Sequence, residues 1–141
     1  MAANVLIVDD SGTMRGMIKR TLSISGLDIG DVFEAANGIE ALAQMHKHAI
    51  NVVLLDINMP VMNGMQMLKR LRDDHRLHGV PVIIASTEGS EQRVHELMDC
   101  GASGYVRKPF RPEQLRDVLA PFVGESDCAA SPASPDDDQA F

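Results

Sequence analysis

Several residues that can bind metal or phosphate follow directly after short apolar runs of the sequence. They are three carboxylates, two hydroxyls and one amine: Asp9, Asp10, Asp56, Ser86, Thr87 and Lys108. An isolated aspartate at such a place is often only a helix N-cap. An isolated Lys-Pro pair is usually part of a turn. The joint occurrence of these residue types, after successive apolar runs, predicts one shared site.

Three carboxylates that meet repel one another, so either one of them keeps a proton or a cation neutralises them. A small set of oxygen ligands is typical of Mg²⁺, which retains several waters and also coordinates phosphate. Zinc is not favoured because the sequence has no cysteine–histidine cluster. The five histidines fall in helical or connecting stretches, and we expect them at the surface. Mg²⁺ is therefore the predicted cofactor, with Asp9, Asp10 and Asp56 around it.

Phosphoryl transfer is the chemistry that this set of residues favours. An aspartate can attack phosphorus and yield an aspartyl phosphate. A cation and Lys108 would offset the charge on the transferred oxygens, which is where such catalysis mostly acts. The Ser86 hydroxyl could donate a hydrogen bond to a phosphoryl oxygen.

Five apolar runs alternate with five stretches of helical periodicity. The runs suit strands buried on both faces, and they span residues 4–8, 31–35, 51–55, 80–85 and 104–107. Apolar spacing predicts an inward face on the first two helices, formed by Met14, Met17, Ile18, Thr21 and Leu22, and by Ile39, Leu42 and Met45. The alternation predicts an α/β fold with a parallel sheet and right-handed crossovers. Ligands of such a sheet bind beyond the carboxyl ends of its strands, where the chemically active residues lie.

Length and charge predict one domain followed by a tail. A chain of 141 residues fits a single domain. Residues 1–123 hold 15 acidic and 13 basic residues. This near balance lacks the excess of positive charge that is typical of nucleic-acid binding. Residues 124–141 are small, acidic and proline-containing, which predicts an acidic disordered tail.

Three features of the sequence predict the compartment. Its two cysteines, Cys100 and Cys128, do not form a disulfide framework, which suits a reducing compartment. The N-terminus has no signal-peptide pattern, and no apolar run is long enough to cross a bilayer. We expect a cytoplasmic protein without membrane insertion.

The chain resembles the receiver domains of response regulators, and most closely their stand-alone chemotaxis type. The resemblance covers residues 4–122 and is carried by the stretches VLIVDDSGTMR, VVLLDINMPVMNGM, PVIIASTE and GASGYVRKPF. It implies a single doubly wound sheet of five parallel strands in the order 2-1-3-4-5 with five helices, as in flavodoxin and CheY. It also implies a two-component signalling protein rather than an enzyme.

The resemblance assigns the centre of the site residue by residue. Asp56 would be the phosphoacceptor and Lys108 the phosphate-binding lysine. Asp10 and Asp56 would coordinate Mg²⁺ directly, and Asp9 largely through water. Asn58 would contribute its backbone carbonyl as a further ligand.

Four residues around that centre also match the family. Ser86 resembles the switch hydroxyl, and Tyr105 the aromatic switch that changes its side-chain position. Asn58 and Glu88 match positions that flank the phosphoryl group and tune its lifetime.

The resemblance also implies partners. A CheA-like histidine kinase would donate the phosphoryl group. Output would come from binding to a downstream protein, either a flagellar motor switch protein or a histidine phosphotransfer protein of a phosphorelay. Asn58 and Glu88 are chemotaxis-like and favour the motor.

Two alternatives from other classes stay open at this stage. A flavin-binding electron carrier can have the same fold, but Asp9 and Asp10 stand where it needs a phosphate cradle. A phosphatase with an aspartyl nucleophile typically has a second aspartate two residues later as general acid, and this chain has Asn58 there.

Overall fold

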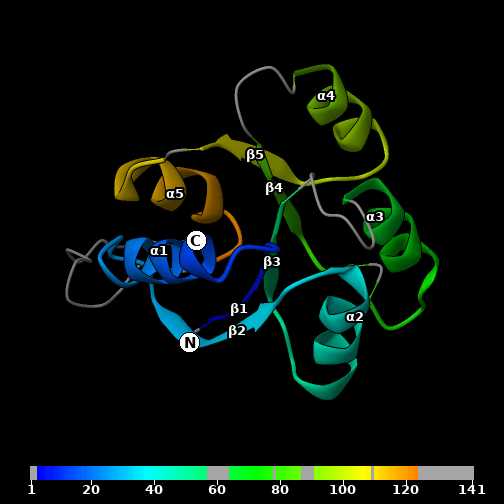
Figure 1. The fold of residues 1–141 in the computed structure, drawn as a ribbon, viewed down its shortest axis with the longest axis horizontal. Helices are drawn as coiled ribbons and strands as arrows, with labels where there is room; N and C mark the ends of the chain where they lie inside the picture. Colours follow the sequence, from blue (N-terminus) through cyan, green and yellow to red (C-terminus); the bar gives the residue numbers. More distant parts are fainter. Residues whose placement is uncertain (1–2, 57–63, 78, 87–90, 109, 124–141) are drawn as a thin grey trace, which may run out of the picture.

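The computed structural model describes residues 3–56, 64–77, 79–86, 91–108 and 110–123 of the chain. Strands and helices alternate strictly along it (Figure 1). The strands are β1 (Ala3–Val8), β2 (Ile29–Ala35), β3 (Val52–Asp56), β4 (Val82–Ser86) and β5 (Gly104–Arg107). The helices are α1 (Gly12–Ser23), α2 (Gly38–Lys47), α3 (Gly64–Asp73), α4 (Glu91–Asp99) and α5 (Pro112–Leu119).

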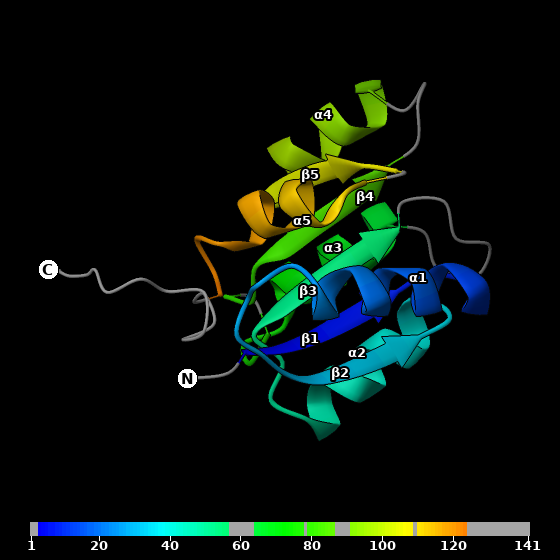
Figure 2. The same cartoon turned by 90° about the vertical axis from the view of Figure 1, so that its left-hand side faces the viewer.

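The strands form one parallel sheet in the order β2-β1-β3-β4-β5. Figure 2 shows the strand arrows running in the same direction, so that their carboxyl ends share one edge. The prediction of an α/β fold with this strand order is confirmed. The predicted boundaries are less accurate: β2 begins two residues earlier than expected, and Asp56 is the last residue of β3 rather than the first residue beyond it.

Helices cover both faces of the sheet, with α1 and α5 on one side and α2, α3 and α4 on the other (Figure 1). Two hydrophobic clusters fill these interfaces. Side chains of β1 alternate between the clusters, with Val5 and Ile7 in the one toward α1 and α5 and Leu6 and Val8 in the other. All five residues of β3 are buried, which explains why the central strands are continuous apolar runs rather than alternating ones.

The helix starts follow ordinary capping chemistry. The Ser11 side chain accepts a hydrogen bond from the backbone N–H of Met14 and begins α1, and Asn37 does the same for Glu40 at α2. Pro112 occupies the first turn of α5, as expected.

Two residues predicted to face the core do not. Met17 is 57% exposed and Ile39 is 58% exposed. On α2 the buried positions include Ala41 and Met45. The prediction for α2 is confirmed at Met45 and at Leu42, which packs against the core. It is wrong at Ile39, because the buried residues of the first turn are the small Gly38 and Ala41.

No helix within the described ranges is both long and apolar enough to cross a membrane. The proposed tail, residues 124–141, lies outside these ranges, so its character stays a prediction.

Candidate functional site

Three carboxylates meet at the carboxyl edge of the sheet. One carboxylate oxygen from each of Asp9, Asp10 and Asp56 lies within 4.8 Å of the others. The register explains the convergence, because Val8 of β1 pairs with Leu55 of β3 and the next residue of each chain segment is an aspartate. Asp9 and Asp56 are 2% and 8% exposed, whereas Asp10 is exposed. The predicted acid cluster is therefore present, with two buried members and one open to solvent.

Lys108 reaches this cluster from the end of β5. Its Nζ donates to Asp9 Oδ2 at 2.8 Å and lies 3.7 Å from Asp56 Oδ2. The Lys108 side chain is only 10% exposed. Buried carboxylates are costly unless they are paired, and the ammonium group supplies that pairing.

Asp9 uses all of its polar atoms. Its carboxylate accepts from Lys108 and from the backbone N–H of Ser11, 2.9 Å away. Its own N–H donates to the Ala35 carbonyl at 3.1 Å, and its carbonyl accepts from Arg15 Nη1 at 2.5 Å. The Asp10 side chain, by contrast, makes no hydrogen bond or ion pair within the described part of the chain.

The donor set fits Mg²⁺. The ion prefers hard oxygen ligands, binds through one or two carboxylates and keeps several waters. The three aspartates supply the oxygens, and the exposure of Asp10 leaves room for water.

The structure describes the remaining predicted site residues only in part. Ser86 is the last residue of β4 and pairs with Arg107 of β5, but its side chain lies outside the described residues. Asn58, Thr87 and Glu88 also lie outside them. Tyr105 lies on β5 and is 53% exposed.

Several polar contacts around the site carry no signature in the sequence and were not predicted. Arg15 on α1 contacts both the Asp9 carbonyl and Glu34 of β2, whose carboxylate Oε1 is 2.9 Å from Arg15 Nε. Two histidines that were expected at the surface have partners as well. His46 Nε2 lies 3.1 Å from the Asp74 carboxylate, and the His48 ring stacks on Phe33. The sequence holds no strong signal for these pairs, because each joins separate elements.

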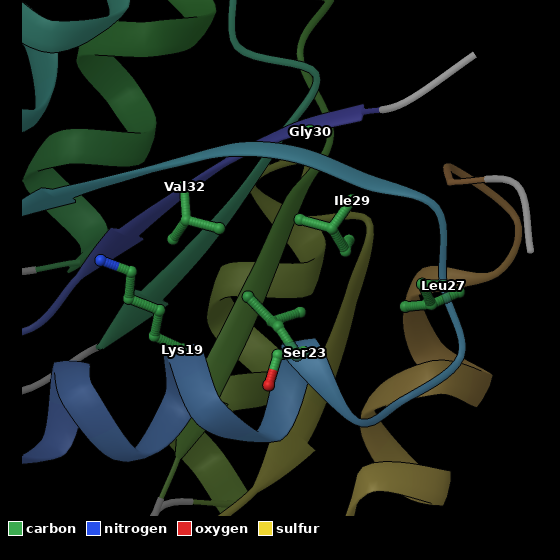
Figure 3. A pocket seen from close by; sticks show the side chains of 7 residues that line it. Lys19, Ser23, Leu27, Ile29, Gly30 and Val32 are labelled. Atoms are coloured by element: carbon green, nitrogen blue, oxygen red, sulfur yellow. The ribbon is translucent and has the colours of Figure 1, made fainter. Parts of the chain in front are cut away.

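A pocket of about 360 Å³ lies elsewhere, between α1 and β2. Figure 3 shows Lys19 and Ser23 of α1 on one side of it and Ile29, Gly30 and Val32 of β2 on the other. Its walls include none of the predicted site residues, so the acid cluster is the better candidate site.

Comparisons with known proteins agree with this geometry. Residues 5–120 match the response regulator receiver domain. The chain is 41% identical to chemotaxis protein CheY1 of Helicobacter pylori over 87% of this chain and 98% of that protein. A CheY homologue of Campylobacter jejuni is 39% identical, over 85% and 92% of the two chains. The solved structure of chemotaxis protein CheY4 from Vibrio cholerae matches with a TM-score of 0.76 and 38% identity, over 86% of this chain and 99% of that one.

Proposed function

We propose, because this chain belongs to the response regulator receiver family, that it is a chemotaxis signalling switch whose phosphoacceptor is Asp56. The observation that carries the proposal is the meeting of three carboxylates with one lysine amine at the carboxyl edge of the sheet. Neither the flavin carrier nor the phosphatase is favoured by the family to which the chain belongs.

Asp56 is suited to act as the nucleophile. One carboxylate oxygen attacks the phosphorus, the new O–P bond forms, and the bond from phosphorus to the donor breaks. With a histidine kinase the leaving group is the donor imidazole, and with acetyl phosphate it is acetate. Asp56 is 8% exposed, so only a donor that reaches the open edge of the site can meet it.

Lys108 and the two neighbouring aspartates prepare the site for the incoming group. Lys108 lies 3.7 Å from Asp56 and can turn its ammonium group from Asp9 to the phosphoryl oxygens. Asp10 and Asp56 are the proposed direct Mg²⁺ ligands, with Asp9 acting through water and Asn58 through its carbonyl. When bound, Mg²⁺ supplies positive charge that offsets the charge of the transferred group.

The switch and the lifetime of the signal are assigned by family resemblance. Ser86 would donate its hydroxyl to the phosphoryl group, and Tyr105 would change position in response. The exposed position of Tyr105 on β5 is compatible with such a movement. Asn58 and Glu88 would tune the slow loss of the phosphoryl group, which the domain itself promotes.

Partners follow from the same proposal. A histidine kinase supplies the phosphoryl group, and a downstream protein binds the phosphorylated form. The chemotaxis names of the relatives favour a flagellar motor switch protein over a histidine phosphotransfer protein. Calorimetric titration of the protein against both candidates, with and without beryllofluoride and Mg²⁺, would separate them. The chain has no tryptophan to report binding by fluorescence.

Labelling with acetyl phosphate tests the site assignment. We expect the wild-type protein to incorporate phosphate when Mg²⁺ is present and to lose the labelling when a chelator is added. Asp56→Asn should abolish the labelling, because an amide is not a nucleophile toward phosphorus. Asp73→Asn, at an exposed carboxylate on α3, is the matched control and should be labelled normally. Undiminished labelling of the Asp56 variant would exclude Asp56 as the acceptor.

A further inference from the structure

We propose that Arg15 is a positioning residue that sets the place of the Asp10 carboxylate and thereby the affinity of the acid cluster for Mg²⁺. The inference rests on the proposed function, because it concerns the same metal site. It is carried by the contacts that Arg15 makes with the backbone of the β1–α1 turn and with β2.

The turn after β1 is held at two points. Within it, the Ser11 N–H donates to Asp9 Oδ1 at 2.9 Å. From outside it, Arg15 Nη1 donates to the Asp9 carbonyl at 2.5 Å. That carbonyl belongs to the peptide group joining Asp9 to Asp10, so Arg15 fixes the plane of the peptide from which Asp10 extends.

Asp10 depends on this backbone contact more than its neighbours do. Asp9 is fixed through its own side chain by Ser11 and Lys108, and Asp56 lies within a buried strand beside Lys108. The Asp10 carboxylate makes no hydrogen bond or ion pair among the described residues. Its position is therefore set by the peptide that precedes it. A misplaced carboxylate would weaken metal binding.

Glu34 keeps the guanidinium group in place. The register pairs Glu34 of β2 with Ile7 of β1, two residues before Asp9. Its carboxylate accepts from Arg15 Nε at 2.9 Å and lies 3.6 Å from Lys19 Nζ, one helical turn further along α1. The Arg15 side chain is only 19% exposed. Two donors of the same planar group thus serve two acceptors at once, which a lysine ammonium cannot reproduce with the same geometry.

The direction of the change in Mg²⁺ affinity on removal of Arg15 distinguishes a positioning role from a purely electrostatic one. Arg15 is a cation near a cation site, so its removal should tighten Mg²⁺ binding if charge alone mattered. If Arg15 acts by holding the Asp9–Asp10 peptide, its removal should weaken binding instead. Loss of an outer contact to a ligand typically weakens metal affinity by about 10-fold to 100-fold, and we expect about 10-fold here.

Calorimetric or NMR titration with Mg²⁺ tests the inference. Arg15→Met, which keeps the length and removes the donors, should raise the Kd about 10-fold. Arg15→Lys should recover only part of this loss. Arg20→Met, at an exposed arginine on the same helix, is the matched control and should bind as the wild type does. Melting without Mg²⁺ reports whether each variant is folded.

A double-mutant cycle then tests whether the effect passes through Asp10. In an Asp10→Asn background, adding Arg15→Met should cause little further loss of Mg²⁺ affinity. Unchanged or tighter Mg²⁺ binding by the folded Arg15→Met protein would overturn the inference. Wild-type protein that binds no Mg²⁺ would instead count against the proposed function.

Discussion

At the scale of single residues, the centre of the site is one ammonium group beside two buried carboxylates, whose combined charge it offsets only in part. Lys108 is held by Asp9 at 2.8 Å and by Asp56 at 3.7 Å. An ammonium group and a divalent cation placed beside the same carboxylates repel each other. Under the proposed function we therefore expect Lys108 to stabilise the metal-free site and to oppose metal binding, while it assists phosphoryl transfer.

This balance predicts the effect of Lys108→Met. The variant should bind Mg²⁺ several-fold more tightly, because a cation about 4 Å away contributes on the order of 1 kcal/mol or more even in a polar environment. It should also melt at a lower temperature without Mg²⁺, and it should accept phosphate from acetyl phosphate more slowly. Titration calorimetry, thermal melting and timed labelling measure the three effects. Mg²⁺ binding that weakens in the variant would show that Lys108 does not compete with the metal.

The residues of the proposed site, and their convergence, were predictable from sequence, and the contacts that hold them were not. Asp9, Asp10, Asp56 and Lys108 follow apolar runs, and the rules of parallel sheets bring such strand ends together. Arg15 serves the site through a backbone carbonyl and a carboxylate on another strand. A carbonyl is present at every position of a chain, so such a contact leaves no signature in the residue types.

At the scale of elements, polar contacts join helices and loops that the hydrophobic pattern places only roughly. Asp74, just beyond α3, accepts the backbone N–H of Arg76 at 2.8 Å and lies 3.1 Å from His46 of α2. The hydrogen bond from Arg76, followed by the charge of His46, lowers the pKa of Asp74. The contact with His46 could not be predicted, because it requires the relative placement of α2 and the end of α3, whereas the hydrogen bond from Arg76 is local to its own turn.

The direction of this pKa shift predicts a pH dependence of stability. A carboxylate with a lowered folded-state pKa contributes stability above its unfolded pKa of about 3.9 and loses it as the pH falls through the lower folded value. Asp74→Asn should therefore lower the urea midpoint slightly at pH 7, and the difference from wild type should shrink as the pH falls below about 3.9. Asp73→Asn is the control. A difference that stays constant over this range would show that the Asp74 charge is not its cause.

The apolar faces of the helices show which burial can be predicted from hydrophobic periodicity and which cannot. The face of α1 was predicted correctly at Ile18 and Leu22, which are buried, and wrongly at Met17, which is 57% exposed. Hydrophobic spacing identifies a helix and its approximate inner face. It does not identify which borderline residue points outward, because that depends on how the helix is rotated against the sheet.

At the scale of the whole molecule, two hydrophobic clusters lie on opposite faces of one sheet, and Val123, the last described residue, is buried in one of them. We expect residues 1–123 to hold the complete receiver. A protein truncated after Val123 should keep its melting temperature and its labelling by acetyl phosphate. Loss of either would assign residues 124–141 a part in the fold or in the site.

Trapping of the phosphorylated residue tests the central claim most directly. Borohydride reduces an aspartyl phosphate to homoserine, so protein treated with acetyl phosphate and Mg²⁺, reduced and then mapped by peptide mass spectrometry carries a permanent mark at the acceptor. The account predicts homoserine at position 56 only, and none when Mg²⁺ is removed. Homoserine at position 9 or 10, or a stable phosphate on a serine or threonine instead, would contradict it.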